Sequence, residues 1–224
     1  MNLQTENLTR VYRLGSSTIT AVNEVSMEVR EATFVTIVGP SGSGKTTLLN
    51  LLGLNDSPTS GKIFFDNEDT DHFSDAKRRR IRLRKLGFVF QTFNLIPTLT
   101  AIENVELPMA FARRTQDEQR KGAFQLLEMV GLKGRLDHRP KELSAGEMQR
   151  VAIARALSNT PKIILADEPT GELDSETGLE IIRLLSELCK TQKTTIIVAT
   201  HDKRVTKVAD VTYEIRDGKI TNMR

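Results

Sequence analysis

The sequence predicts an α/β protein that combines a parallel sheet, an antiparallel β-rich start and an inserted helical segment. Two short apolar runs, Lys162–Asp167 and Thr195–Thr200, flank a helix expected over Ser175–Leu188. Strand, helix and strand in this order are typical of parallel strands joined by a right-handed crossover. Val22–Val29 alternates apolar and polar residues like a half-buried strand. Because the pattern from 92 to 160 is helical, a β-edged core is expected to carry a helical insertion.

The other predicted elements complete this core. A loose alternation over Leu8–Leu14 adds a strand to the β-rich start, and the apolar run Phe34–Val38 is consistent with a buried parallel strand. Leucines in the stretch Lys45–Leu54 fit a helix with one apolar face. The segments Val211–Ile215 and Lys219–Met223 predict a hairpin around an Asp-Gly turn.

The composition is that of a soluble globular protein and excludes several classes. Charged residues make up 27% and hydrophobic residues 38% of the 224 residues. No apolar run reaches the roughly 18 residues of a membrane span, and the first residues lack a charged-then-apolar leader, so secretion is not expected. The net charge of +3 is too small to indicate nucleic-acid binding by itself. A single cysteine, Cys189, excludes an intramolecular disulfide and fits a reducing compartment.

A glycine-rich loop between a predicted strand and a predicted helix indicates a nucleotide site. The segment Gly39–Thr46, GPSGSGKT, matches the pattern G-x-x-x-x-G-K-S/T in full. Its glycines let successive backbone N–H groups converge on phosphate oxygens, and the helix N-terminus adds partial positive charge. Lys45 supplies a full charge to the outer phosphates, and the Thr46 hydroxyl is a candidate Mg²⁺ ligand. The candidate phosphate-binding residues are Gly39, Pro40, Ser41, Gly42, Ser43, Gly44, Lys45, Thr46 and Thr47.

Two carboxylates follow a buried strand that is expected to end beside this loop. Asp167 and Glu168 come after the run Ile163–Leu165, at the edge where open α/β sheets bind ligands. Asp167 is a candidate Mg²⁺ ligand. Glu168 is a candidate general base that polarises a water for attack on the γ-phosphate. A solvated loop start is the alternative for such a pair, and the upstream phosphate loop argues against it.

Two further polar residues end strands at the same predicted edge. His201 follows Thr200 and can donate to the γ-phosphate or orient the catalytic groups, although a lone histidine after a strand is more often structural. Gln91 closes the strand Leu86–Phe90, and its amide can contact Mg²⁺ or the attacking water; a polar strand terminus is the alternative. The candidate catalytic residues are therefore Lys45, Gln91, Glu168 and His201.

Two other segments each allow two interpretations. Ser144 with Glu147 three residues later is a capping box, but the same helix N-terminus is a potential site for a phosphate held by another subunit. The run Lys77–Lys85 holds seven basic residues in nine and no aromatic residue. This pattern favours a solvated helix face, near anionic headgroups or a partner loop, over a nucleic-acid patch.

In this combination and order the motifs resemble those of the ATP-binding-cassette (ABC) ATPases. The resemblance covers essentially the whole chain, through the phosphate loop, Gln91, Leu143–Glu147, Asp167–Thr170 and His201. Within the family the chain is most similar to small cytoplasmic subunits of the lipoprotein-releasing and macrolide-exporter group. Three segments carry that similarity: GFVFQ at 87–91, NLIP at 94–97 and ENVELP at 103–108.

The resemblance implies one domain, 1–224, built on a P-loop NTPase core of the RecA-like type. The nucleotide-binding α/β core would comprise 1–91 and 161–224, and a helical subdomain would comprise 92–160. The implied ligands are ATP and Mg²⁺. The implied protein is a cytoplasmic ATP-hydrolysing subunit, peripheral on the inner face of the cell membrane, that drives a separate transmembrane permease. Nucleic acid is not an expected partner.

Several residues take roles through the resemblance alone. Tyr12 would stack on adenine, where a strand aromatic in the core is the alternative. Ser144 and Gly146 would close the nucleotide site of a second copy, so two sites form only in a nucleotide-dependent, head-to-tail homodimer. Asp174 would bridge the two copies. The insertion around Thr92–Asn104 would dock the membrane partner, and Gln91 would report nucleotide state to it.

Two departures from the family pattern affect the segment that begins at Leu143. Ala145 replaces the first of two adjacent glycines in the family signature, and Glu147 replaces its common glutamine. A methyl group near the γ-phosphate would crowd the closed dimer or merely restrict the backbone.

Three other functions are weighed against transport. Force transmission to a membrane complex that controls cell-wall enzymes is barely separable from transport by sequence. A soluble ABC ATPase that acts on DNA or ribosomes usually has a second cassette or a long coiled coil, and neither fits in 224 residues. A GTP-binding switch is disfavoured because the sequence has no Asn-Lys-x-Asp motif.

Overall fold

The computed structural model describes residues 1–15 and 17–224, and its centre is a six-stranded sheet in the order β10-β9-β3-β8-β7-β6. Five strands run parallel, and β10 pairs antiparallel with β9 at one edge. The predicted C-terminal hairpin is therefore confirmed. The strands are β3 (Phe34–Val38), β6 (Leu86–Val89), β7 (Ile163–Asp167), β8 (Thr195–Thr200), β9 (Val211–Arg216) and β10 (Lys219–Met223).

A second, antiparallel sheet forms the β-rich start of the chain, in the order β2-β1-β4-β5. The strands β1 and β2 begin earlier than predicted, because pairing of Leu3 with Val29 and of Tyr12 with Ile19 extends their ladder. Its strands are β1 (Leu3–Leu14), β2 (Ser17–Val29), β4 (Ser60–Phe65) and β5 (Glu68–Asp69).

The helices differ from the predicted ones mainly at their ends. The helix predicted over Lys45–Leu54 ends at Leu52, since Gly53 caps it and Leu54 is left-handed (φ 56°). The helices are α1 (Lys45–Leu52), α2 (Asp75–Lys85), α3 (Ala101–Phe111), α4 (Gln116–Met129), α5 (Ala145–Leu157) and α6 (Ser175–Gln192). Short 3₁₀ turns are η1 (Thr70–His72), η2 (Lys133–Arg135), η3 (Pro140–Glu142) and η4 (Lys203–Val208).

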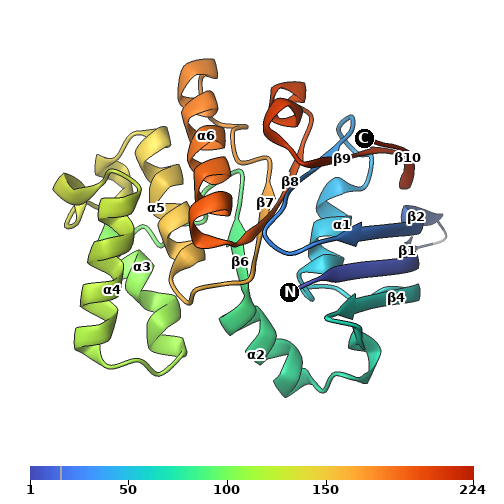
Figure 1. Cartoon of the computed structure of the whole chain (residues 1–224), viewed down its shortest axis with the longest axis horizontal. Helices are drawn as coiled ribbons and strands as arrows, with labels where there is room; N and C mark the ends of the chain where they lie inside the picture. Colours follow the sequence, from blue (N-terminus) through green and yellow to red (C-terminus); the bar gives the residue numbers. More distant parts are fainter. Residues whose placement is uncertain (16) are drawn as a thin grey trace.

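Alternate residues of the central strands bury their side chains in two separate cores. In β8, Ile197 and Ala199 pack with the leucines of α1 and with the antiparallel sheet, whereas Ile196 and Val198 pack with α3, α4, α5 and α6. This alternation is the period of two that a strand covered on both faces requires. Figure 1 shows α3, α4 and α5 gathered on one side of the central strands, with α1 and β1, β2 and β4 on the other.

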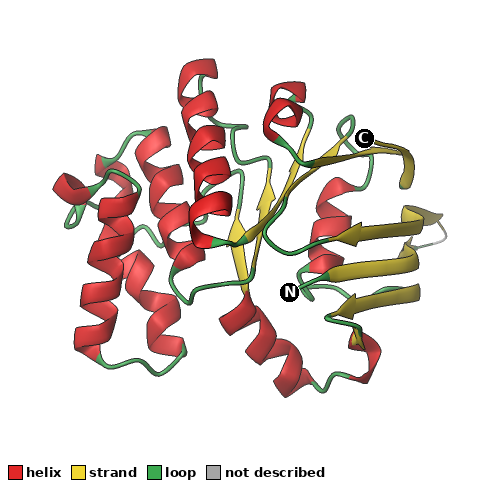
Figure 2. Ribbon diagram, in the orientation of Figure 1, coloured by secondary structure: helices red, strands yellow, loops and turns green. Residues whose placement is uncertain are grey.

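The predicted fold class is confirmed by these layers, which Figure 2 shows by element type. Because β3, β7 and β8 are parallel and adjacent, the residues that follow them meet at one edge of the sheet. No helix in the described part of the chain is both long and apolar enough to span a bilayer. The division into 1–91 with 161–224 and 92–160 stays a prediction.

Candidate nucleotide site

The glycine-rich loop joins the end of β3 to the start of α1, as predicted. Gly44 precedes the helix with φ 99°, and no side chain caps the first turn. A methyl group on Gly44 would overlap the carbonyl oxygen of Ala21 on β2, so this position requires glycine. The Ser43 hydroxyl is buried and has no hydrogen-bond partner among the described residues. The loop therefore offers backbone N–H groups and one hydroxyl to a ligand.

Other predicted loop residues lie on the rim of the same turn. Pro40, Ser41 and Gly42 are exposed, and Gly42 also has a positive φ of 77°. Thr47 is half-buried in the first turn of α1. Their contacts with phosphate stay predictions.

Lys45 is the buried cation of the site. Its side chain is 7% exposed, and Nζ donates to the carbonyl oxygens of Gly39 and Pro40, both at 3.0 Å. Nζ also lies 3.6 Å from Oε1 of Glu168. The folded chain thus brings the predicted charge-neutralising lysine and the predicted base together.

Glu168, which follows β7, is held at the edge of the sheet by contacts from the end of the neighbouring strand β8. Its Oε2 accepts from the Thr200 hydroxyl at 2.9 Å and from the His201 backbone N–H at 3.3 Å. His201 Nδ1 lies 3.1 Å from the carboxylate. The sequence-based reasoning missed Thr200, although its place directly before His201 at the end of a buried strand put it on this edge.

Asp167 lies beside Glu168 and carries a perturbed carboxyl group. Burial raises the pKa of Asp167, and the neighbouring Glu168 charge adds to this, while the nearby Thr46 hydroxyl and the charge of Lys45 oppose it. One carboxyl oxygen, Oδ1, is buried without a hydrogen-bond partner in the described part of the chain. A desolvated carboxylate oxygen beside a threonine hydroxyl is a donor set that suits Mg²⁺.

The described part of the chain contains no cluster of three or more His, Cys, Asp or Glu residues that could hold a metal ion. Mg²⁺ bound through one or two carboxylates and substrate phosphates needs no such cluster. The residues present therefore fit a magnesium ion that arrives with a nucleotide.

Gln91 lies two residues after β6 and reaches the loop that follows Glu168. Its Nε2 donates to Glu172 at 3.1 Å, and its side chain packs against Gly171. Among the described residues no hydrogen bond joins Gln91 to Thr46 or Asp167, so its metal role stays a prediction. The segment after Gln91 is fixed by Arg155, which donates to the carbonyl oxygens of Phe93 and Asn94.

Tyr12 lies near the end of β1 with its ring half-buried and outside both cores. Its hydroxyl donates to Asp56 at 2.7 Å, and the Arg10 guanidinium carbon lies 4.6 Å from the ring centroid. These contacts argue against the alternative of a core aromatic. Stacking on adenine stays a prediction.

The predicted partner-facing residues form a separate group at the N-termini of α5 and α6. The Ser144 hydroxyl accepts from the Glu147 N–H at 3.2 Å, which confirms the capping box. Gly146 packs against Thr177, and Asp174 caps α6 by accepting from Glu176 and Thr177 at 3.0 Å. Within residues 1–15 and 17–224 no hydrogen bond or ion pair joins Ser144, Gly146 or Asp174 to the phosphate loop.

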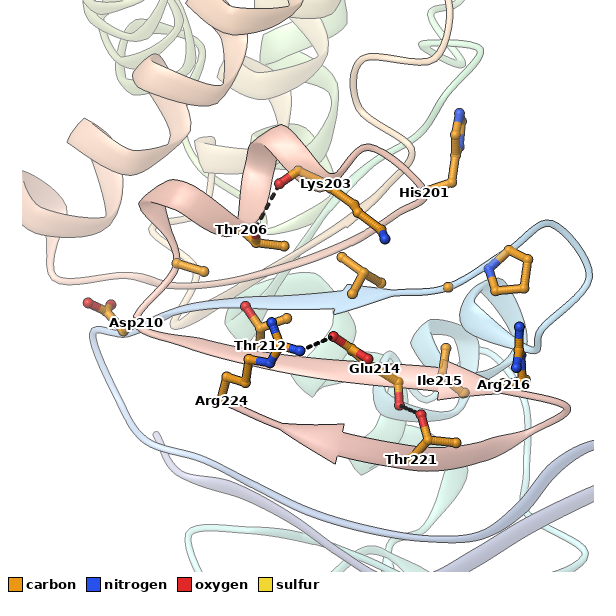
Figure 3. A pocket seen from close by; sticks show the side chains of 14 residues that line it. His201, Lys203, Thr206, Asp210, Thr212, Glu214, Ile215, Arg216, Thr221 and Arg224 are labelled. Carbon is orange, nitrogen blue, oxygen red and sulfur yellow. Dashed lines mark hydrogen bonds and ion pairs between the residues drawn. The ribbon is translucent and has the colours of Figure 1, made fainter.

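A hollow of about 840 Å³ borders the site on the side of β9. Gly39, Pro40 and His201 are among the residues that line it, and most of the others come from η4, β9 and β10. Glu214 and Arg224 form an ion pair of 3.5 Å within it (Figure 3). The residues Lys45, Thr46, Asp167 and Glu168 do not line this hollow, so it borders the predicted phosphate site and does not enclose it.

Known proteins resemble this chain throughout. The profile of the ABC transporter family matches residues 22–171. An ABC transporter ATP-binding protein of Thermotoga maritima is 50% identical over 94% of this chain and 90% of its own. The ATP-binding protein MJ0796 of Methanocaldococcus jannaschii is 47% identical over 97% of this chain and 94% of its own.

The fold agrees with this assignment. A dimeric structure of the MJ0796 cassette, described as a post-hydrolysis state bound to ADP and Pi, superposes with a TM-score of 0.91 and 45% identity, over 99% of this chain and 97% of the other. The resemblance predicted from the motifs is confirmed. The chain belongs to the ABC transporter family, as one of its ATP-hydrolysing ATP-binding subunits.

Proposed function

We propose that this chain binds two MgATP between two copies in head-to-tail contact and uses their hydrolysis to drive a separate membrane permease of the export or lipoprotein-release type. The observation that carries the proposal is the cluster of Lys45, Glu168 and His201 beside the uncapped start of α1. A buried cation, a fixed carboxylate and free helix N–H groups are the parts that phosphoryl transfer from a triphosphate needs.

The phosphate loop would bind the triphosphate in this proposal. The backbone N–H groups before α1 and the Ser43 hydroxyl donate to phosphate oxygens. The Lys45 ammonium neutralises charge on the outer phosphates. Because Lys45 is buried and already aimed at the loop carbonyls, little side-chain entropy is lost when it binds.

The metal site would be shared between protein and substrate. Thr46 and Asp167 would hold Mg²⁺, with the amide oxygen of Gln91, whose Nε2 donates to Glu172, as a further donor. The ion supplies positive charge that stabilises the β- and γ-phosphate oxygens. The unpartnered Oδ1 of Asp167 supports this part of the proposal.

Hydrolysis would use Glu168 as the general base. Its carboxylate accepts a proton from a water, the water oxygen bonds to the γ-phosphorus, and the bond to the bridging oxygen breaks to leave ADP and phosphate. Thr200 and the His201 N–H fix the carboxylate. The His201 side chain is 68% exposed, so its ring can turn to a γ-phosphate oxygen.

The second copy would complete each site. Ser144, Gly146 and Asp174 lie at helix starts away from the phosphate loop of their own chain, which leaves them free to contact the nucleotide of another. The dimeric state of the MJ0796 cassette supports this arrangement. The permease and the position on the inner face of the membrane rest on the family alone.

The test is the substitution Glu168→Gln. Loss of the base lowers turnover by about 10³-fold, while ATP binding persists because the phosphate loop is intact. The expected readouts are a malachite-green phosphate assay and a dimer on gel filtration with MgATP. Lys77→Gln on α2 is the matched control and leaves turnover unchanged. Rapid ATP hydrolysis by the Glu168→Gln variant would show that Glu168 is not the general base.

A further inference from the structure

The ring of Tyr12 is held by two residues that no motif includes. Asp56 Oδ2 accepts from the Tyr12 hydroxyl at 2.7 Å and from Arg10 Nε at 2.9 Å. Arg10 Nη2 lies 2.8 Å from the other oxygen of the same carboxylate. The Arg10 guanidinium also covers the ring, with its carbon 4.6 Å from the centroid. The three side chains therefore fix one another in a closed triangle.

The triangle is anchored to the loop that follows α1. The Asp56 N–H donates to the carbonyl oxygen of Asn50 at 3.3 Å, and the Ser57 N–H donates to Asp56 Oδ1 at 2.7 Å. Burial works against ionisation of Asp56, but the bonds from Tyr12, Ser57 and Arg10 outweigh it and lower its pKa. The carboxylate is three-quarters buried, as is Arg10, so the pair is shielded from solvent.

The register of β1 and β2 ties this triangle to the phosphate loop. Arg10 pairs with Val22 and Val11 pairs with Thr20, so the ladder skips Ala21. The carbonyl of this bulged residue is the group that packs against Gly44. Bulges of this kind re-aim side chains beside functional sites. Tyr12 follows Arg10 by two residues on β1, so the pairing of β1 with β2 sets its position relative to the phosphate loop.

Part of the Tyr12 side chain is open to solvent. Arg10 covers one face, and Tyr12 is only half-buried. Its direct cross-strand partner is Ile19, which points to the same side of the sheet and is 50% exposed. A planar ring beside an exposed aliphatic side chain offers apolar area of the kind that a purine base covers.

We propose that Arg10 and Asp56 are positioning residues that hold the Tyr12 ring for the adenine base, with the guanidinium on one face and the base on the other. The proposal rests on the ATP site proposed above and extends it to residues outside every family motif. Because the ring is already fixed before ATP binds, no side-chain entropy of Tyr12 is lost when the base stacks on it. Arg10 and Asp56 thus act on the base and not on the phosphates.

The test compares ATP with inorganic triphosphate, which has the phosphates without the base. Calorimetry in EDTA measures both dissociation constants for the intact chain. Asp56→Ala raises the Kd for ATP about fivefold, as loss of one hydrogen bond predicts, and Arg10→Gln raises it about threefold. Neither variant changes the Kd for triphosphate.

A double-mutant cycle separates positioning from loss of packing. Tyr12→Phe keeps the ring and removes its hydrogen bond to Asp56. As a single substitution it weakens ATP binding, but it causes no further loss of ATP affinity when Asp56 is already replaced by alanine. Arg30→Gln, which removes an exposed ion pair with Glu28 at 3.3 Å, is the matched control and changes neither constant. Urea unfolding of each variant checks that the chain is folded at the assay temperature.

Two outcomes would overturn the inference. Unchanged ATP affinity in Asp56→Ala and Arg10→Gln means that the ring needs no support. An equal loss of affinity for ATP and for inorganic triphosphate means that the triangle only stabilises the sheet. A wild-type chain that binds neither compound would instead refute the proposed function itself.

Discussion

Two helices of this chain begin with motifs that predict anion binding, and their N-termini are built in opposite ways. The helix α1 begins after Gly44, with no side-chain cap and no acidic residue in its first turn. The helix α5 begins after Ser144, whose hydroxyl accepts from the Glu147 N–H, while the Glu147 carboxylate accepts from the Ser144 N–H at 2.8 Å. Within the described residues, the first-turn N–H groups of α1 meet no side-chain acceptor, whereas at α5 the Glu147 N–H is already bound by Ser144.

The N-termini of α1 and α5 also differ in charge. Lys45 adds a cation to α1, whereas Glu147 adds an anion to α5, and Arg135 binds that anion at 2.8 Å. The hydrogen bond from Arg135, followed by those from Ser144, lowers the pKa of Glu147, so it stays ionised near neutral pH. The start of α1 therefore presents positive charge and the start of α5 presents negative charge, and the contact of Ser144 with the nucleotide of a second copy stays a proposal.

The largest expected effect comes from filling the space that α1 leaves at its start. Gly44→Ala combines a positive φ with overlap of the Ala21 carbonyl, so we expect the free energy of unfolding to fall by about 3 kcal/mol. Urea denaturation followed by circular dichroism measures it.

Gly42→Ala is the matched control for this experiment. Gly42 also has a positive φ, of 77°, but a methyl group there meets nothing within 4 Å. The Gly42→Ala substitution is expected to lower the free energy of unfolding by about 1 kcal/mol. Equal costs for the two variants would contradict the tight contact between Gly44 and β2.

The next effect separates capping from nucleotide contact at α5. Ser144→Ala and Thr115→Ala each remove the cap of a capping box, and each should cost about 1 kcal/mol of stability. Only Ser144 is proposed to meet the nucleotide of a second copy. Turnover at saturating ATP is therefore expected to fall about tenfold in Ser144→Ala and to stay unchanged in Thr115→Ala. A tenfold loss in both variants would mean that helix stability alone limits turnover.

The parts of the site that sequence predicts are those carried by local pattern. The loop Gly39–Thr46 lies between a strand and a helix that both have clear periodicity, and parallel strands must deliver Glu168 and His201 to one edge. Ser144 was predictable for the same reason, since a capping box spans only four residues.

The parts that sequence does not predict depend on contacts between distant residues. Asp56 meets Tyr12 across 44 positions, and the ladder of β1 and β2 is shifted beside Arg10 by a bulge that no periodicity reveals. Arg155 reaches Phe93 across 62 positions to hold a turn in which Phe93 and Asn94 both have positive φ. Such contacts arise from register and packing, which a single sequence leaves open.

The smallest expected effect tests the alanine that replaces a signature glycine. Ala145 is the first residue of α5 and has a helical backbone with negative φ, which a Cβ atom fits without strain. Ala145→Gly is therefore expected to change turnover by less than about twofold and to lower the free energy of unfolding by about 0.5 kcal/mol. Steady-state phosphate release and urea unfolding measure the two quantities. A rise in turnover of about tenfold or more would show instead that the methyl group crowds the closed dimer. The start of α5 would then need glycine for the same steric reason as the start of α1.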